Sequence, residues 1–341
     1  GTNNTFIGGL AGDANTTGSG VTAIGKDALG SNTTGSNNTA VGNGTLVSNT
    51  TGTANVAVGT GINGVDVGTL ALNTTGSNNT AMGHQALRSN TTADNNTAVG
   101  KSALLANTTG TRNNALGANA LDANTTGSYN VAIGYSSLGV NVSGNSNTAV
   151  GDNTLSNNTA SQNTAICENS MAVNTTGANN VALGWASLDA NTTGSQNVAV
   201  GGAALSNNTT SNELTAVGYA ALLSHTTGVR NTAIGYEAGK GITTGTDNVI
   251  VGGDAAPAIT TGSRNVAMGR EALRAVTTAN NNTAVGASAL RFNTGGDNTA
   301  LGYLALYACT TGQQNVAVGA FALDASQATS DNTAVGYATL T

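Results

Sequence analysis

The stretch Asn38-Thr39-Ala40-Val41-Gly42, followed by Leu46 and by Asn49-Thr50-Thr51-Gly52, returns with small changes along the whole chain. We call the glycine that closes each Thr/Val-Ala-Val run the anchor. Such a fixed short period predicts a solenoid, in which each unit stacks on its neighbours because it cannot bury its own apolar face. The anchors are Gly8, Gly25, Gly42, Gly59, Gly83, Gly100, Gly117, Gly134, Gly151, Cys167, Gly184, Gly201, Gly218, Gly235, Gly252, Gly269, Gly286, Gly302, Gly319 and Gly336.

The anchors are mostly 17 residues apart, with single deletions before Cys167 and Gly302 and an irregular insertion near residues 60–68. Because the period is unbroken, we predict one all-β domain over residues 1–341, a parallel β-solenoid of about twenty coils. The coils are expected to stack about 4.8 Å apart in an elongated rod of roughly 95 Å. The pattern does not run at helical spacing, and the Asn- and Gly-rich corners disfavour a helix.

Two apolar positions mark each coil. The residue before the anchor is aliphatic in all twenty copies, and the one before that is almost always Ala. Alternate residues of a strand share a face, so we expect Val41, Val58 and Val99 to pack inward and the smooth Ala/Gly face to meet other chains. Four residues after the anchor, usually at a Leu such as Leu46, we expect a second strand-like piece.

Composition excludes several classes of function. Only 8% of the 341 residues are charged and the net charge is −6, so no basic surface for nucleic acid is expected. No apolar run is long enough to cross a membrane. Cys167 and Cys309 lie too many coils apart to form a disulfide, and we expect both to be small buried residues. The chain begins and ends inside a repeat, which favours a segment of a longer fibre.

Asparagine occupies two kinds of position. The Asn of the Asn-Thr-Thr-Gly corner is replaced by Ile242, Ile259 and Val276 in some copies, so we expect it to turn inward and stack in a ladder. The phrase Asn-Asn-Thr also forms an N-glycosylation acceptor at a more exposed corner. The candidate glycosylation sites are Asn37, Asn78 and Asn95.

Aromatic residues gather directly after the anchor. They either pack at a corner of the rod or form a row of sugar-stacking surfaces, since an aromatic ring combines apolar area with a polar tip. These candidate glycan-contacting residues are Tyr135, Trp185, Tyr219, Tyr236, Tyr303 and Tyr337.

Catalytic and metal-binding patterns are missing from the repeat. His84 and His225 lie far apart without the spacing of metal ligands, and no pair of carboxylates recurs for acid–base work. No glycine-rich phrase leads into a helix that could hold a phosphate. We therefore expect no catalytic residues, no bound metal, no cofactor and no enzymatic activity.

The phrases Asn130-Val131-Ala132-Ile133-Gly134 and Asn231-Thr232-Ala233-Ile234-Gly235-Tyr236 resemble the repeats of trimeric autotransporter adhesin heads and of phage tail fibres. The resemblance covers essentially the whole chain. It implies a left-handed β-roll, three chains side by side, and display outside a cell or virion.

Three functions are consistent with these patterns. The first is a structural and adhesive extracellular fibre segment, homotrimeric, that binds cell-surface glycans through repeated weak contacts and neither binds nucleic acid nor inserts into a membrane. The second is a self-assembling end-to-end filament, coated with glycans. The third is an ice-binding solenoid, which is disfavoured because adjacent residues such as Thr33 and Thr34 cannot share one flat face.

Overall fold

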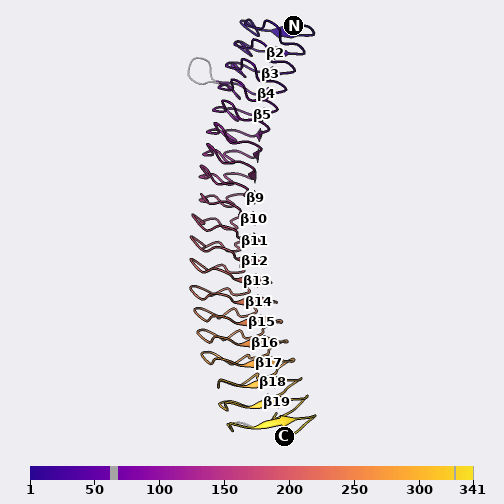
Figure 1. Cartoon of the computed structure of the whole chain (residues 1–341), viewed down its shortest axis with the longest axis vertical. Helices are drawn as coiled ribbons and strands as arrows, with labels where there is room; N and C mark the ends of the chain where they lie inside the picture. The colour runs from indigo at the N-terminus through magenta and orange to yellow at the C-terminus, as the bar shows by residue number, and fades with distance from the viewer. Residues whose placement is uncertain (62–67, 326–327, 341) are drawn as a thin grey trace. The chain divides into compact units, whose positions relative to one another are not determined.

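The computed structural model describes residues 1–61, 68–325 and 328–340, all of them in strands, turns and irregular segments without a helix. The chain divides into two compact units, which we call unit 1 (1–175) and unit 2 (176–341). Each unit is a stack of coils with one short strand per coil (Figure 1). The prediction of an all-β parallel solenoid is confirmed.

Ten three-residue strands lie in unit 1. They are β1 (Thr5–Ile7), β2 (Thr22–Ile24), β3 (Thr39–Val41), β4 (Val56–Val58), β5 (Thr80–Met82), β6 (Thr97–Val99), β7 (Asn114–Leu116), β8 (Val131–Ile133), β9 (Thr148–Val150) and β10 (Thr164–Ile166).

Ten more strands of the same length lie in unit 2. They are β11 (Val181–Leu183), β12 (Val198–Val200), β13 (Thr215–Val217), β14 (Thr232–Ile234), β15 (Val249–Val251), β16 (Val266–Met268), β17 (Thr283–Val285), β18 (Thr299–Leu301), β19 (Val316–Val318) and β20 (Thr333–Val335).

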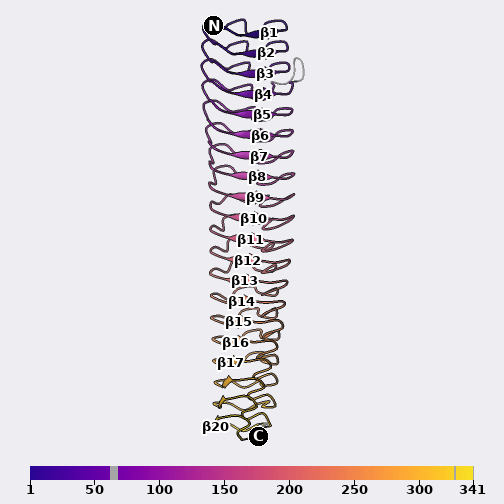
Figure 2. The ribbon, with the colours of Figure 1, turned by 90° about the vertical axis from the view of Figure 1, so that its right-hand side faces the viewer.

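Successive strands of each unit pair in parallel and in register, so equivalent residues of neighbouring coils lie side by side (Figure 2). Ala23 pairs with Ala40 in unit 1, and Ala199 pairs with Ala216 in unit 2. The register survives the irregular intervals, because Val58 still pairs with Met82 across the predicted insertion. Residues 62–67 of that insertion lie outside the described residues.

The strands face the opposite way from the expectation. The middle residue, usually Ala, is buried in every strand except β1, whereas Val41, Val58 and Val99 are only half-buried. The prediction of inward-facing Val and an outward-facing Ala/Gly surface is therefore wrong. The Ala methyl group shares the coil interior with a buried Leu such as Leu46, so the larger β-branched residues of most strands are left on the outside.

The second apolar position is a turn and not the expected strand. Leu46 is fully buried, but it has a φ of 48°, and Leu205 in unit 2 has a φ of 52°. This left-handed conformation is unfavourable for β-branched side chains. It explains why the position accepts Leu, Met, Ala and Gly but never Val or Ile.

The anchor glycines let neighbouring coils touch backbone to backbone. Gly134 has a φ of 127°, and a β-carbon placed on it would lie 2.6 Å from the carbonyl carbon of Gly151. A side chain is therefore excluded by both conformation and space. Cys167 is the exception, with a φ of 99° and an exposed thiol, so the expectation that both cysteines are buried holds only for Cys309.

Two stacks of buried amides line the coils. The corner column contains the Asn that opens each Asn-Thr-Thr-Gly corner, and Asn49 Nδ2 donates to Asn32 Oδ1 at 2.8 Å. This confirms the predicted internal ladder. The strand column contains the Asn directly before each strand, and Asn38 Oδ1 accepts from the backbone N–H of Asn55 at 2.9 Å. Both columns satisfy polar groups that would otherwise be buried unpaired.

Candidate functional site

The first and last residues of every strand form one outward surface in each unit, which we call the strand face. Its aliphatic members are partly exposed, with Leu116 at 50%, Met268 at 42% and Leu301 at 47% of their surface. The other member of each strand is Thr or Val, except Asn114. The strand face thus presents apolar side chains, repeated coil after coil, to solvent.

The strand face carries no charged residue in either unit. The neighbouring position directly after the anchor differs, because it accepts Lys26, Lys101, Asp152, Glu168 and Arg270. A surface that simply faces water normally carries charges, whereas a surface that becomes covered excludes them. The composition therefore separates a face that suits contact from an adjacent corner that suits solvent.

The six candidate glycan-contacting aromatics lie in that solvent-facing position. More than half of each residue is exposed, from 52% for Tyr135 to 77% for Tyr337. Tyr219 and Tyr236 come from adjacent coils of unit 2 and stack with their ring centroids 5.7 Å apart and their planes inclined by 16°. Tyr303 and Tyr337 each contact Phe321 edge to face instead.

Charged groups border the stacked tyrosines. The Glu237 carboxylate accepts a hydrogen bond from Lys240 Nζ at 2.5 Å. This contact lowers the pKa of the Glu237 carboxyl below its ordinary value. The Tyr236 hydroxyl also hydrogen-bonds to Glu237, which raises the pKa of Tyr236. A phenol held by a fixed carboxylate stays neutral and oriented.

The candidate glycosylation sites are accessible. Asn37, Asn78 and Asn95 are exposed, and each has a φ near 60° in the turn that precedes a strand. By contrast Asn32, in the corner acceptor motif, is fully buried and donates to Asn15. Only the first kind of acceptor could carry a sugar without unfolding the coil.

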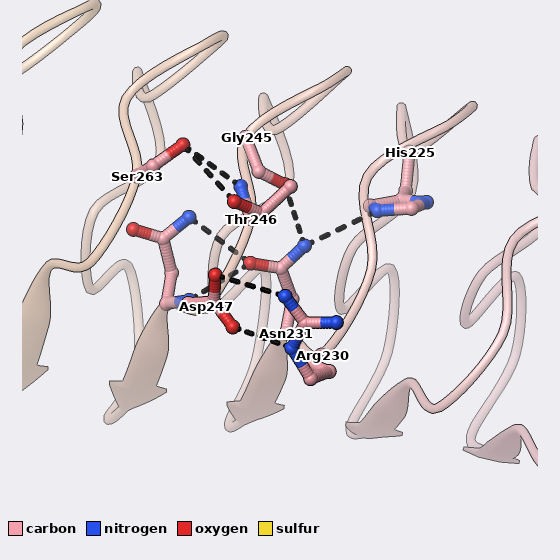
Figure 3. A network of polar contacts seen from close by, with 8 residues as sticks. His225, Arg230, Asn231, Gly245, Thr246, Asp247 and Ser263 are labelled. Atoms are coloured by element: carbon pink, nitrogen blue, oxygen red, sulfur yellow. Dashed lines mark hydrogen bonds and ion pairs between the residues drawn. The ribbon is translucent and has the colours of Figure 1, made fainter.

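A polar network in unit 2 shows where the corner column changes (Figure 3). His225 takes the place of Asn, is fully buried, and its Nε2 lies 3.3 Å from Nδ2 of Asn231. Burial lowers the pKa of His225 to about 4. On the surface above, Arg230 donates to Asp247 at 2.7 Å and lowers the pKa of that carboxyl.

The strand column was not predicted from the sequence. In the sequence, the Asn before the strand stands out only as part of the glycosylation motif and of the repeated phrase. Its near-invariance across the repeats was the available signal, since only Val21 and Leu214 interrupt it between Asn4 and Asn332.

The described residues contain no cluster of His, Cys, Asp or Glu that could hold a metal ion. Within either unit, the described part of the chain forms no detectable cavity for a small ligand. No described stretch forms a helix able to cross a bilayer. No protein-family model matches the chain, and a search of curated proteins finds no significant match.

Proposed function

We propose that this chain is a non-enzymatic, structural and adhesive segment of an extracellular fibre, in which copies of the chain associate through their strand faces. The observation that carries the proposal is the uncharged, partly exposed strand face, whose last residue is aliphatic in every strand. An exposed apolar surface that repeats coil after coil favours burial against a partner.

A second copy of this chain is the occupant that fits best. Neighbouring strands are in register, so the apolar residues recur once per coil. A copy with the same repeat can match them coil by coil over its whole length, whereas a partner without the period would match only locally. In a trimer with threefold symmetry, the strand face of each copy would be covered by the other copies, in keeping with the resemblance to trimeric fibre heads.

The corners next to the strand face remain free in this arrangement to display binding groups. Each coil offers a weak site at most, but repetition along three copies multiplies weak contacts into useful avidity. The turn at the other end of the strand carries the candidate glycosylation sites Asn37, Asn78 and Asn95. These features support a surface-displayed fibre rather than a filament joined only end to end.

Sedimentation equilibrium tests the association. We expect a mass three times the 33.1 kDa of one chain. The double variant Val99→Glu/Val217→Glu places a charge on the strand face of each unit and should sediment as a monomer with an unchanged circular dichroism spectrum. Thr92→Glu/Thr227→Glu adds the same charge at exposed corners and should remain trimeric. A wild-type monomer at high concentration, or dissociation of both variants alike, contradicts the proposal.

A further inference from the structure

The stacked pair Tyr219 and Tyr236 differs from the other exposed aromatics of the chain. Its rings are nearly parallel, with centroids 5.7 Å apart, and their exposed fractions are 55% and 56%. The two rings therefore form one apolar platform that solvent reaches. Tyr135 occupies the same position in unit 1 and has a similar exposed fraction of 52%, but no stacked ring accompanies it in the described contacts.

The coils on either side leave the platform open. The equivalent position is Gly202 on the preceding coil and Gly253 on the following coil. A β-carbon placed on Gly253 would meet no atom within 4 Å, and one on Gly202 would lie 3.5 Å from the Tyr219 ring. Ala203 and Ala220 keep the adjacent positions small. No side chain at this position of either neighbouring coil therefore covers the platform.

Polar groups lie beside the platform. The Glu237 carboxylate is held between Lys240 and the Tyr236 hydroxyl, and Asp254 lies close enough to influence both Tyr236 and Lys240. Carboxylate oxygens accept hydrogen bonds from hydroxyl groups, and an ammonium group donates to them. The site thus combines an apolar stacking surface with hydrogen-bonding groups at its edge.

The platform stays accessible when copies associate. Its position after the anchor carries Lys101, Asp152 and Arg270 on other coils, and these charges would be costly inside a dry interface. A chain contact through the strand face therefore leaves this corner in solvent. The platform would then occur once per copy and three times per trimer.

We propose that Tyr219 and Tyr236, with Glu237 and Lys240 at their edge, form a binding site for a neutral oligosaccharide. The C–H face of a pyranose ring packs on the aromatic surface, and its hydroxyl groups hydrogen-bond to the carboxylate and ammonium groups. The inference deepens the proposed adhesive function and names its ligand class. Lys240 is already paired with Glu237, and the remaining Asp254 carboxylate repels an acidic sugar, so the site selects neutral saccharides.

Saturation-transfer NMR on the full chain tests the site with cellotriose, triacetylchitotriose and 3′-sialyllactose as probes. We expect at least one neutral trisaccharide to bind with a dissociation constant of order 1 mM, and sialyllactose to bind more weakly. The variant Tyr219→Ala/Tyr236→Ala should weaken binding at least about tenfold. The matched control Tyr129→Ala should leave binding unchanged, since that ring is 53% exposed but packs against Arg112 and lies outside the row that follows the anchor.

A gain-of-function variant provides a second readout. Gly253→Tyr adds a third ring at a position where the β-carbon meets no atom within 4 Å, and it should strengthen binding about two- to tenfold. No binding of either neutral probe by the wild-type chain, equal binding by the Tyr219→Ala/Tyr236→Ala variant, or a preference for sialyllactose overturns the proposal. Sedimentation of the same samples tests the association of copies separately from the saccharide site. A chain that is monomeric but still binds the saccharide through Tyr219 and Tyr236 would contradict the association and support the site.

Discussion

The two units build their interiors from the same repeat but use the buried amides differently. In unit 1 the corner column is Asn in all ten coils, from Asn15 to Asn174. In unit 2 it is Asn191 and Asn208, then His225, Ile242, Ile259 and Val276, and after these Asn293 and Cys309. The strand column continues through both units with one interruption in each. The corner column is therefore apolar in three consecutive coils of unit 2, whereas the strand column accepts an apolar residue only once in each unit, at Val21 and Leu214.

The hydrogen bonds explain this difference. In unit 1 the Gly144 carbonyl accepts from both Asn141 of the corner column and Asn130 of the strand column. In unit 2 Gly262 has Ile259 at its corner, and Asn248 of the strand column still donates to its carbonyl at 2.9 Å. The corner amide is thus redundant at this carbonyl. The strand-column oxygen also accepts a backbone N–H of the next coil, a role that an apolar side chain cannot fill.

The largest expected effect comes from removing one amide of the strand column. Asn248→Leu in unit 2 leaves both the Gly262 carbonyl and the Asn265 N–H without this partner, which should cost about 2–6 kcal/mol. Asn130→Leu in unit 1 removes the partner of the Asn147 N–H, but Asn141 keeps Gly144 bonded, so the cost should be about 1–3 kcal/mol. Hydrogen exchange resolved by segment measures both losses. Equal losses would mean that the two units do not differ as described.

Acid should destabilise unit 2 through His225. Its pKa falls from 6.5 in the unfolded chain to about 4 in the folded chain, so the unfolded state binds more protons between these values. Stability is therefore full above pH 6.5 and is lost progressively as the pH falls to 4. The fall in pKa corresponds to about 3 kcal/mol at 1.36 kcal/mol per unit.

Protonation would also place an N–H of His225 against the amide hydrogens of Asn231, so opening should begin near this coil. Denaturant unfolding of unit 2 at pH 7 and pH 4 measures the effect. His225→Asn restores the residue used in unit 1 and should remove this part of the pH dependence, while the carboxylates titrate alike in both proteins. Persistence of the full dependence in that variant would assign it to other groups.

Exchanging corner-column residues between the units should give smaller effects. Ile259→Asn brings an amide between Ile242 and Val276, where its oxygen has no neighbouring amide, and should cost about 1–3 kcal/mol. Asn124→Ile interrupts the column of unit 1 and should cost a similar amount. Replacing Asn107, Asn124 and Asn141 together by Ile should cost less than the sum of the three single changes, because each column bond is then counted once. Thermal unfolding of the three single Asn→Ile variants and of the triple variant measures these costs. Strict additivity would contradict a cooperative column.

The smallest effect concerns the anchor, which is glycine in every coil of unit 2 but Cys167 in one coil of unit 1. Cys167→Gly should stabilise unit 1 by less than about 1 kcal/mol, because relief of the left-handed conformation is partly offset by the greater chain entropy of glycine. Gly235→Ala serves as the reverse control. Its β-carbon would lie 2.6 Å from the Gly252 carbonyl carbon and should destabilise unit 2 strongly. A shift in midpoint temperature measures both variants.

The candidate site was predicted in part. The aromatic row was found from its constant distance to the anchor, and Tyr219 and Tyr236 stack because a 17-residue period returns them to equivalent places on adjacent coils. The strand face was assigned the wrong direction. Alternation identifies which residues share a face, but it does not say which of the two faces is inside.

The sequence by itself determined the period, the parallel in-register stacking and the inward position of the corner amides. The reason is that a strict repeat places each residue beside the equivalent residues of the neighbouring coils. Only the tertiary structure decided which strand face is buried and that Leu46 and its equivalents adopt a left-handed turn. Both outcomes depend on how the side chains pack inside the coil. Ala, Leu and Asn from separate parts of the repeat share that interior, so no single position of the sequence encodes the packing.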